Sequence, residues 1–169
     1  LNDGGIDAHA LALHVQKTGG VANFKGAGRI DKDDFYETKV DVFVPAALEQ
    51  MITEAEAKML NCKVVAEGAN APTTPAGERV LESRGIEVLP AILCNAGGVT
   101  VSYFEWVQNK TCRAWDLEEV DAQLNKHMVR AAAKVRDARK KYKCNLRTAA
   151  YIGALERLRA AYEIRGLFP

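Results

Sequence analysis

The sequence predicts an α/β fold in which a small parallel sheet is followed by a set of helices. Three observations support this prediction. Short apolar runs alternate with helical patterns over residues 40–89, no tight hairpin turn separates these runs, and the pattern is helical from residue 95 onward. Parallel strands need a crossover connection, usually a helix, so this order favours parallel pairing with right-handed crossovers.

The N-terminal part is predicted to hold one helix and one long loop. In IDAHALALHVQKTGG, apolar residues recur at helical spacing from Ile6 to Val15, Asp7 lies in the first turn, and Gly19 ends the helix. The next segment, VANFKGAGRIDKDDFYE at residues 21–37, is interpreted as a loop.

Three short apolar runs are predicted to be buried strands joined by helices. The first run, KVDVFVP, is β-branched and aromatic and closes at Pro45. A helix over about Thr53 to Leu60 separates it from the second run, CKVVAEGAN. The next helix lies in TTPAGERVLESRG, where Thr74 suits the N-cap, Pro75 the first helical position and Gly85 the C-terminal end. The third run is IEVLP at residues 86–90.

The rest of the chain is predicted to form three helices. They span Asn95 to about Gln108, Leu117 to about Tyr142 and Arg147 to about Ile164. The middle helix carries an apolar stripe on one face, made of Leu117, Val120, Leu124, Met128, Ala131 and Val135. The apolar residues of the last helix, which include Leu155, Leu158 and Tyr162, are interpreted as packing residues.

Composition excludes several classes of function. The chain has 169 residues, is 48% hydrophobic and carries 23 basic and 22 acidic residues for a net charge of +1, so nothing indicates nucleic acid as a partner. No apolar run approaches the roughly 20 residues that cross a membrane. The four cysteines form no CxxC pair and the three histidines lie far apart, so we expect a reducing compartment and no metal site.

Ligands of open parallel sheets lie beyond the carboxyl ends of the strands. At the first end, Pro45, Ala46 and Ala47 keep the strand exit free of bulk, which suits either a flat ligand or simply a tight turn. At the second end, Gly68 and Ala69 favour close approach of a ligand to the backbone, and Asn70 offers a donor and an acceptor. Asn70 is equally typical of a turn.

The third end, CNAGGVTVSYFEWVQN at residues 94–109, opens a helix with two glycines. Each glycine costs a helix interior about 1 kcal/mol relative to alanine, so some feature beside the backbone should require them. Asn95, Val99 and Ser102 fall on one face of this helix. Either a flat ligand lies against that face, or the helix packs closely on a strand.

The segments AEGANAPTTP and CNAGGVTVSYFEWVQN together resemble the glutamate dehydrogenases, within the wider glutamate, leucine, phenylalanine and valine dehydrogenase family. The resemblance extends from GGIDAHALALHVQKTGGVANFKGA through VDVFVPAALEQMIT to the terminal CNLRTAAYIGALERLRAAYEIRGLFP. The ending is most similar to that of the compact hexameric enzymes of prokaryotes, plants and algae, since there is no room for the antenna insertion of the longer animal type.

The resemblance implies a fold and a set of site residues. The fold is the second half of a Rossmann-like doubly wound parallel sheet followed by C-terminal helices. The implied binding residues for NAD or NADP are Asn70, Asn95, Pro45, Ala46, Ala47 and Ala69. Val99 and Ser102 match positions that face the substrate, with Ser102 donating a hydrogen bond to the side-chain carboxylate of glutamate.

Several parts of the family's machinery do not occur in this chain. The G-x-G-x-x-G turn, its flanking strands and the catalytic lysine and aspartate are absent, and Gly26 and Gly28 lie in a loop that does not replace that turn. Residues 1–110 are thus expected to form a partial dinucleotide-binding domain, and residues 111–169 a helical segment that packs back toward a missing substrate domain. The start at Leu1 inside a turn also predicts a fragment of a longer protein.

By the resemblance, the parent enzyme interconverts glutamate with 2-oxoglutarate and ammonia, forms a homo-hexamer and resides in the mitochondrial matrix, with cytoplasm and chloroplast as alternatives. The isolated chain is expected to be inactive. Two other hypotheses stay open: a truncated relative that serves as a structural or interaction module, and a sister amino-acid dehydrogenase, against which Ser102 argues.

Overall fold

The computed structural model describes residues 1–166 of the chain, which divide into two compact units. The first unit holds Leu1–Thr38 with Met59–Asn61, and the second holds Lys39–Lys58 and the chain from Cys62 onward. The boundary predicted after residue 110 stays a prediction.

The first unit contains two helices, α1 (Ala8–Thr18) and α2 (Lys32–Glu37). The Asp7 carboxylate caps α1 by accepting hydrogen bonds from the N–H groups of His9 and Ala10, and Gly19 ends it with a positive φ of 78°. The prediction of a loop over residues 21–37 was wrong at α2. This helix is too short to show apolar periodicity. The sequence indicates it only through Asp33 and Asp34, which favour a first helical turn.

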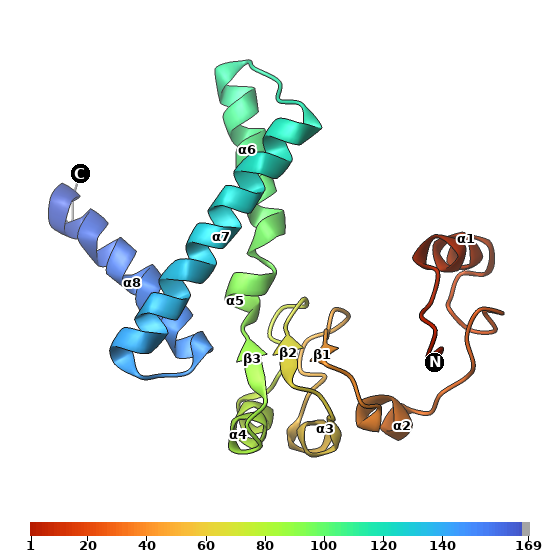
Figure 1. The fold of residues 1–169 in the computed structure, drawn as a ribbon. Coiled ribbons are helices and arrows are strands. Elements are labelled where there is room, and N and C mark those ends of the chain that lie inside the picture. Colours follow the sequence, from red (N-terminus) through yellow and green to blue (C-terminus); the bar gives the residue numbers. More distant parts are fainter. Residues whose placement is uncertain (167–169) are drawn as a thin grey trace. The chain divides into compact units, whose positions relative to one another are not determined.

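The second unit contains the predicted parallel sheet (Figure 1). Its strands are β1 (Val42–Phe43), β2 (Val64–Ala66) and β3 (Glu87–Leu89), in the order β1-β2-β3. β2 pairs in parallel with both neighbours. The connections contain α3 (Glu54–Met59) and α4 (Pro75–Ser83), so the predicted alternation of strands and helices is confirmed. Whether this sheet is half of a Rossmann-like one stays a prediction.

The α4 helix shows why these residues fold as predicted. The Thr74 hydroxyl accepts the N–H of Gly77 at 3.1 Å, and Pro75 occupies the first turn. A Cβ atom on Gly77 would lie 2.5 Å from the carbonyl oxygen of Ile52, so only glycine lets the helix approach the backbone after β1 this closely. Gly85 follows the helix with a φ of +72°.

Four helices follow the sheet: α5 (Ala91–Cys94), α6 (Ala96–Thr111), α7 (Leu117–Tyr142) and α8 (Leu146–Arg165). The three predicted helices are confirmed, and α5 was not predicted. α5 and α6 continue from β3 in nearly the same direction (Figure 1). α7 packs against α6 and α8, and the start of α8 reaches β3. Side chains of Asp116 and Asn145 cap α7 and α8.

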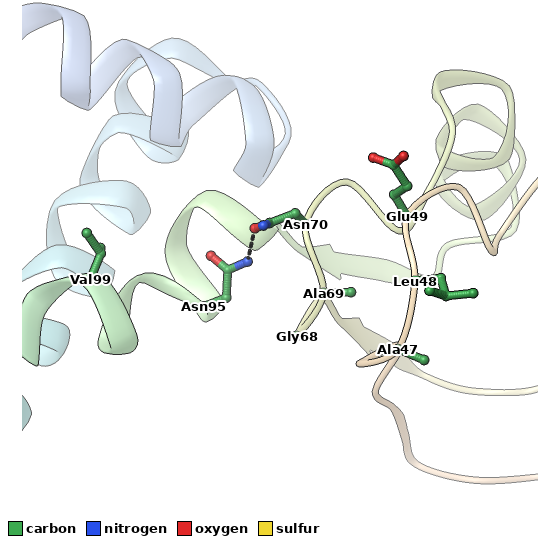
Figure 2. Close-up of a pocket in the computed structure, with 8 residues that line it drawn as sticks. All are labelled: Ala47, Leu48, Glu49, Gly68, Ala69, Asn70, Asn95 and Val99. Atoms are coloured by element: carbon green, nitrogen blue, oxygen red, sulfur yellow. Dashed lines mark hydrogen bonds between the residues drawn. The ribbon is translucent and has the colours of Figure 1, made fainter. Parts of the chain in front are cut away.

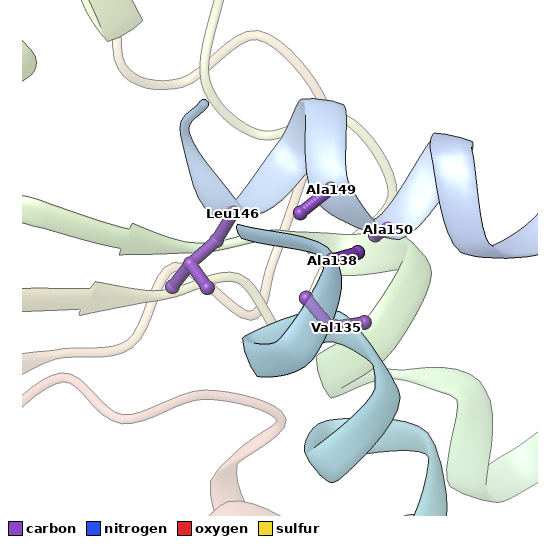
Figure 3. Close-up of a cluster of buried hydrophobic side chains, with 5 residues drawn as sticks. All are labelled: Val135, Ala138, Leu146, Ala149 and Ala150. Carbon is purple, nitrogen blue, oxygen red and sulfur yellow. The ribbon is translucent and has the colours of Figure 1, made fainter. Parts of the chain in front are cut away.

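A buried cluster joins α7 and α8 (Figure 3). Residues of β3 and α5 pack against it. Its members are Val135, Ala138, Leu146, Ala149 and Ala150, with Leu89, Leu93 and Cys144 packed against them. Three of the five are alanines, which let the two helix backbones approach closely. The second half of α8 is more exposed: Leu155, Leu158 and Tyr162 are 62%, 56% and 58% exposed. They are therefore not buried against other residues within 1–166, in contrast to their interpretation as packing residues.

Candidate functional site

An open cleft of about 820 Å³ lies where the segments that follow the three strands converge (Figure 2). Its lining comes from three places in the sequence: Ala47, Leu48 and Glu49 after β1, Gly68, Ala69 and Asn70 after β2, and Asn95 and Val99 after β3. The carboxyl ends of parallel strands meet at one edge, which explains why residues 50 positions apart line one space.

The structure places five of the eight predicted site residues in this lining, namely Ala47, Ala69, Asn70, Asn95 and Val99. The other three, Pro45, Ala46 and Ser102, lie beside the cleft without lining it. Pro45 is buried, and its carbonyl oxygen accepts the N–H groups of Gly68 at 3.1 Å and Ala69 at 2.9 Å. Pro45 therefore supports the cleft by joining the exit of β1 to that of β2.

Close packing accounts for Gly68. A Cβ atom there would lie 3.1 Å from the Cβ of Ala46, tighter than ordinary van der Waals contact. Because its N–H also bonds to Pro45, the backbone at Gly68 serves the contact between two strand exits. Gly68 therefore makes internal contacts and also lines the cleft, and the predicted approach of a ligand to its backbone stays a prediction.

Asn70 and Asn95 face one another across the cleft and are joined by a hydrogen bond (Figure 2). The Asn95 Nδ2 donates to the Asn70 Oδ1 at 2.7 Å. Asn95 stands at the N-cap of α6 but makes no side-chain capping bond, so its amide is turned outward as expected. The Asn95 Oδ1 and the Asn70 Nδ2 have no hydrogen-bond partner among residues 1–166, which leaves one acceptor and one donor for a ligand.

Two glycines open α6 beside Asn95. A Cβ on Gly97 would find its nearest neighbour at 3.9 Å, in Leu124, and one on Gly98 would meet nothing within 4 Å. Close helix packing therefore does not require glycine at either position within the part of the chain that the structure describes. The remaining interpretation is a surface kept flat for a ligand or for another part of the protein.

Val99 and Ser102 continue the same face of α6. Val99 is 70% exposed and lines the cleft, so it offers the cleft an apolar surface. Ser102 is exposed, and its hydroxyl donates to the carbonyl oxygen of Gly98 at 3.2 Å. That bond is local and replaceable, so the hydroxyl can turn to a ligand.

A buried ion triad holds the exits of β2 and β3 together. Glu67 is fully buried, and its Oε2 accepts the N–H of Ala91 at 2.7 Å, which caps α5 from across the sheet. Its Oε1 accepts a hydrogen bond from Arg147 Nη2 at 2.7 Å, and Arg147 Nε pairs with Glu78 Oε2 at 2.7 Å. Burial lowers the pKa of Arg147, but the hydrogen bonds and charges of Glu67 and Glu78 outweigh it and raise that pKa overall.

Some contributors to the site were missed by the sequence analysis. Leu48 and Glu49 line the cleft, and Glu67 and Arg147 brace it. Glu67 left a usable signal, because a carboxylate directly after an apolar strand is buried and needs a partner. Arg147 left none, since its partners lie 69 and 80 residues away in sequence.

The cleft offers amide hydrogen-bonding groups and little acid or base chemistry. Glu49 is the one ionisable side chain among its lining residues. No group of three or more His, Cys, Asp and Glu side chains within residues 1–166 is placed to hold a metal ion. No helix in the same range is long and apolar enough to cross a membrane.

Comparison with known proteins places this geometry in a family. The model of the glutamate/leucine/phenylalanine/valine dehydrogenases matches residues 1–166. Glutamate dehydrogenase of Thermotoga maritima is 44% identical over 168 residues, and NAD-specific glutamate dehydrogenase of Clostridioides difficile is 41% identical over 167; each comparison covers 99% of this chain and 40% of the relative.

The solved structure of hetero-hexameric glutamate dehydrogenase from Thermus thermophilus is similar with a TM-score of 0.88 and 29% identity, over 99% of this chain and 39% of that one. The chain thus spans about 40% of the length of the curated relatives that it matches.

Proposed function

Because the chain belongs to the glutamate/leucine/phenylalanine/valine dehydrogenase family, we propose that it is the C-terminal portion of an NAD-dependent glutamate dehydrogenase. The whole protein would convert glutamate to 2-oxoglutarate and ammonia, and catalyse the reverse reaction. Relatives that are named NAD-specific support NAD as the first coenzyme to test. The resemblance at Ser102 supports glutamate as the substrate.

The observation that carries this proposal is the Asn70–Asn95 pair in the cleft. The pair leaves one amide donor and one amide acceptor open, which is the complement of a carboxamide group. Beside it, Gly97 and Gly98 keep the start of α6 free of side chains. The residues present therefore fit a flat ring that carries a carboxamide, as nicotinamide does.

When bound, the nicotinamide supplies the hydride acceptor for the α-carbon of glutamate. Asn70 and Asn95 would hold the carboxamide and fix which face of the ring meets the substrate. Val99 would give an apolar wall that excludes water at that point. Ser102 would donate to the side-chain carboxylate, and a buried site built to hydrogen-bond that group rejects substrates that lack it.

The acid and base groups of the reaction would come from outside this chain, since the lining offers only Glu49. We therefore propose that residues 1–169 alone do not oxidise glutamate. A hexameric assembly is proposed by analogy with the hetero-hexameric relative from Thermus thermophilus. The mitochondrial matrix is retained as the proposed compartment on the resemblance of the C-terminal tail alone.

The test uses the protein at its natural length. We expect glutamate-dependent reduction of NAD⁺, and NADH binding detected by fluorescence titration. Asn95→Ala should weaken NADH binding about tenfold or more, because it removes hydrogen bonds worth about 1 kcal/mol each. Asn125→Ala is the matched control, since Asn125 is exposed on α7 and does not line the cleft. Absence of NADH binding, or equal affinity in Asn95→Ala and wild type, would contradict the proposal.

A further inference from the structure

Two hydrogen bonds connect the segment that follows β2 to the segment that follows β3, and one of them joins Asn70 to Asn95. One tether is the Asn70–Asn95 bond itself, and the other is the bond from the Ala91 N–H to Glu67. Only two residues separate Glu67 from Asn70, and three separate Ala91 from Asn95. The position of the Asn70–Asn95 bond in the cleft therefore depends on the Glu67–Ala91 bond, which is wholly buried.

The Glu67–Ala91 bond depends on the buried charge of Glu67, which Arg147 neutralises. The Glu67 side chain is 0% exposed, and Arg147 Nη2 is its only cationic partner within residues 1–166, at 2.7 Å. A buried carboxylate without a cation is strongly disfavoured, and removal of one member of such a pair leaves that cost uncompensated. Without Arg147, Glu67 would leave its place or recruit water, and Ala91 would lose its acceptor.

We propose that Arg147 is a positioning residue for coenzyme binding: by neutralising Glu67 it keeps the Glu67–Ala91 tether in place, and with it the Asn70–Asn95 pair. This inference rests on the proposed function. Arg147 touches neither member of the Asn pair and does not line the cleft, so it acts through Glu67.

The second carboxylate of the triad provides the internal control. Glu78 lies in the first turn of α4 and bonds to Arg147 Nε through both oxygens, at 2.9 and 2.7 Å. The hydrogen bonds of Ala91, Asn70 and Asn95 described above do not involve Glu78. Loss of Glu78 weakens the anchoring of α8 to α4 and leaves the Arg147–Glu67 contact intact. A purely structural role of Arg147 would make Glu78 as important for coenzyme binding as Glu67.

The experiment measures NADH affinity and kcat for the protein at its natural length in four forms. Arg147→Met removes the charge but keeps most of the side-chain volume, and we expect its Kd for NADH to rise at least about tenfold, as for a buried charge left unpaired. In the double variant Arg147→Met/Glu67→Gln, the neutral amide still accepts the Ala91 N–H, so affinity should return to within about threefold of wild type. Glu78→Gln should bind NADH with wild-type affinity and melt at a lower temperature.

The rescue decides the proposal even if Arg147→Met does not fold, because in the double variant the fully buried residue 67 is neutral and only Glu78, which is 14% exposed, lacks its cation. If the double variant binds NADH as weakly as Arg147→Met, or more than about tenfold more weakly than wild type, Arg147 does not act through Glu67 and the inference is overturned. Unchanged affinity for NADH in Arg147→Met would also overturn the inference about Arg147. In that case, normal NADH binding by wild type and weak binding by Asn95→Ala would still support the proposed function. Failure of the wild type to bind NADH would overturn both.

Discussion

Gly98 is a helical residue with open space beside its Cα atom. Alanine at this position should favour the α6 helix by up to about 1 kcal/mol. The added methyl group would, however, stand on the surface where we place the coenzyme, and overpacking of that kind costs about 1–3 kcal/mol. We therefore predict that Gly98→Ala is as stable as wild type or more so, yet binds NADH about tenfold more weakly. Thermal unfolding and fluorescence titration of the natural-length protein measure the two effects.

Gly77→Ala is the matched comparison. Gly77 is also helical, but its added Cβ would lie 2.5 Å from the Ile52 carbonyl oxygen, so this variant should be clearly destabilised. If Gly98→Ala lost stability as Gly77→Ala does, then Gly98 would be a packing glycine and not part of a surface kept open for a ligand.

The four cysteines differ in the chemistry expected of their thiols. Burial raises the pKa of Cys62, and burial together with the nearby Glu67 charge raises that of Cys94. A higher pKa means less thiolate at neutral pH and slower alkylation. Exposed Cys112 should therefore react first with iodoacetamide, with Cys62 and Cys94 several-fold slower. Peptide mass spectrometry on the native protein measures the order, and equal rates for Cys94 and Cys112 would contradict it.

Individual residues that line the cleft were predictable only where they belong to a local sequence pattern. Asn70 and Asn95 each follow an apolar strand in a segment of small residues, and strand order brings such segments together. For Pro45 and Ala46 the sequence left two uses open, contact with a flat ligand or a tight turn, and in the structure both residues lie against Gly68 and Ala69. Distinguishing the two uses needs the distance between neighbouring loops, which a sequence does not contain.

At the level of elements, the long α7 helix depends on a single capping side chain at its start. The Asp116 carboxylate accepts the N–H of Glu119 at 2.7 Å. Asp116→Ala should cost about 1 kcal/mol locally and speed amide exchange in the first turn of α7 about fivefold. Asp116→Asn retains an acceptor oxygen and should exchange as wild type does. Hydrogen exchange with mass spectrometry of peptides over this turn measures the difference, and identical exchange in all three proteins would rule out the cap.

Elements with several turns or with paired end signals were predictable from the sequence. Thr74, Pro75 and Gly85 bracket α4, and α7, which carries an apolar stripe from Leu117 to Val135, was predicted to span Leu117 to about Tyr142, as observed. The two helices that escaped prediction are short. α5 has four residues, and its first N–H is capped by Glu67, 24 residues away, so its formation is a tertiary effect.

At the scale of the whole molecule, the described chain leaves apolar surface on several elements. Leu155 and Leu158 on α8, Trp106 on α6 and Val42 on β1 are each at least half exposed. On α8, Leu155, Leu158 and Tyr162 recur at helical spacing, and a continuous apolar strip of this kind marks a surface that contacts another protein segment. This agrees with a chain that spans about 40% of its relatives' length.

The position of β1 at the edge of the sheet has a consequence for handling the chain. β1 is the terminal strand in the order β1-β2-β3, and Val42 and the adjacent Val44 are 50% and 57% exposed. An edge strand that carries exposed valines is a template on which other chains can add strands. Produced on their own, these 169 residues should therefore form concentration-dependent oligomers in light scattering, and a lysine at Val44 should act as a gatekeeper that suppresses them.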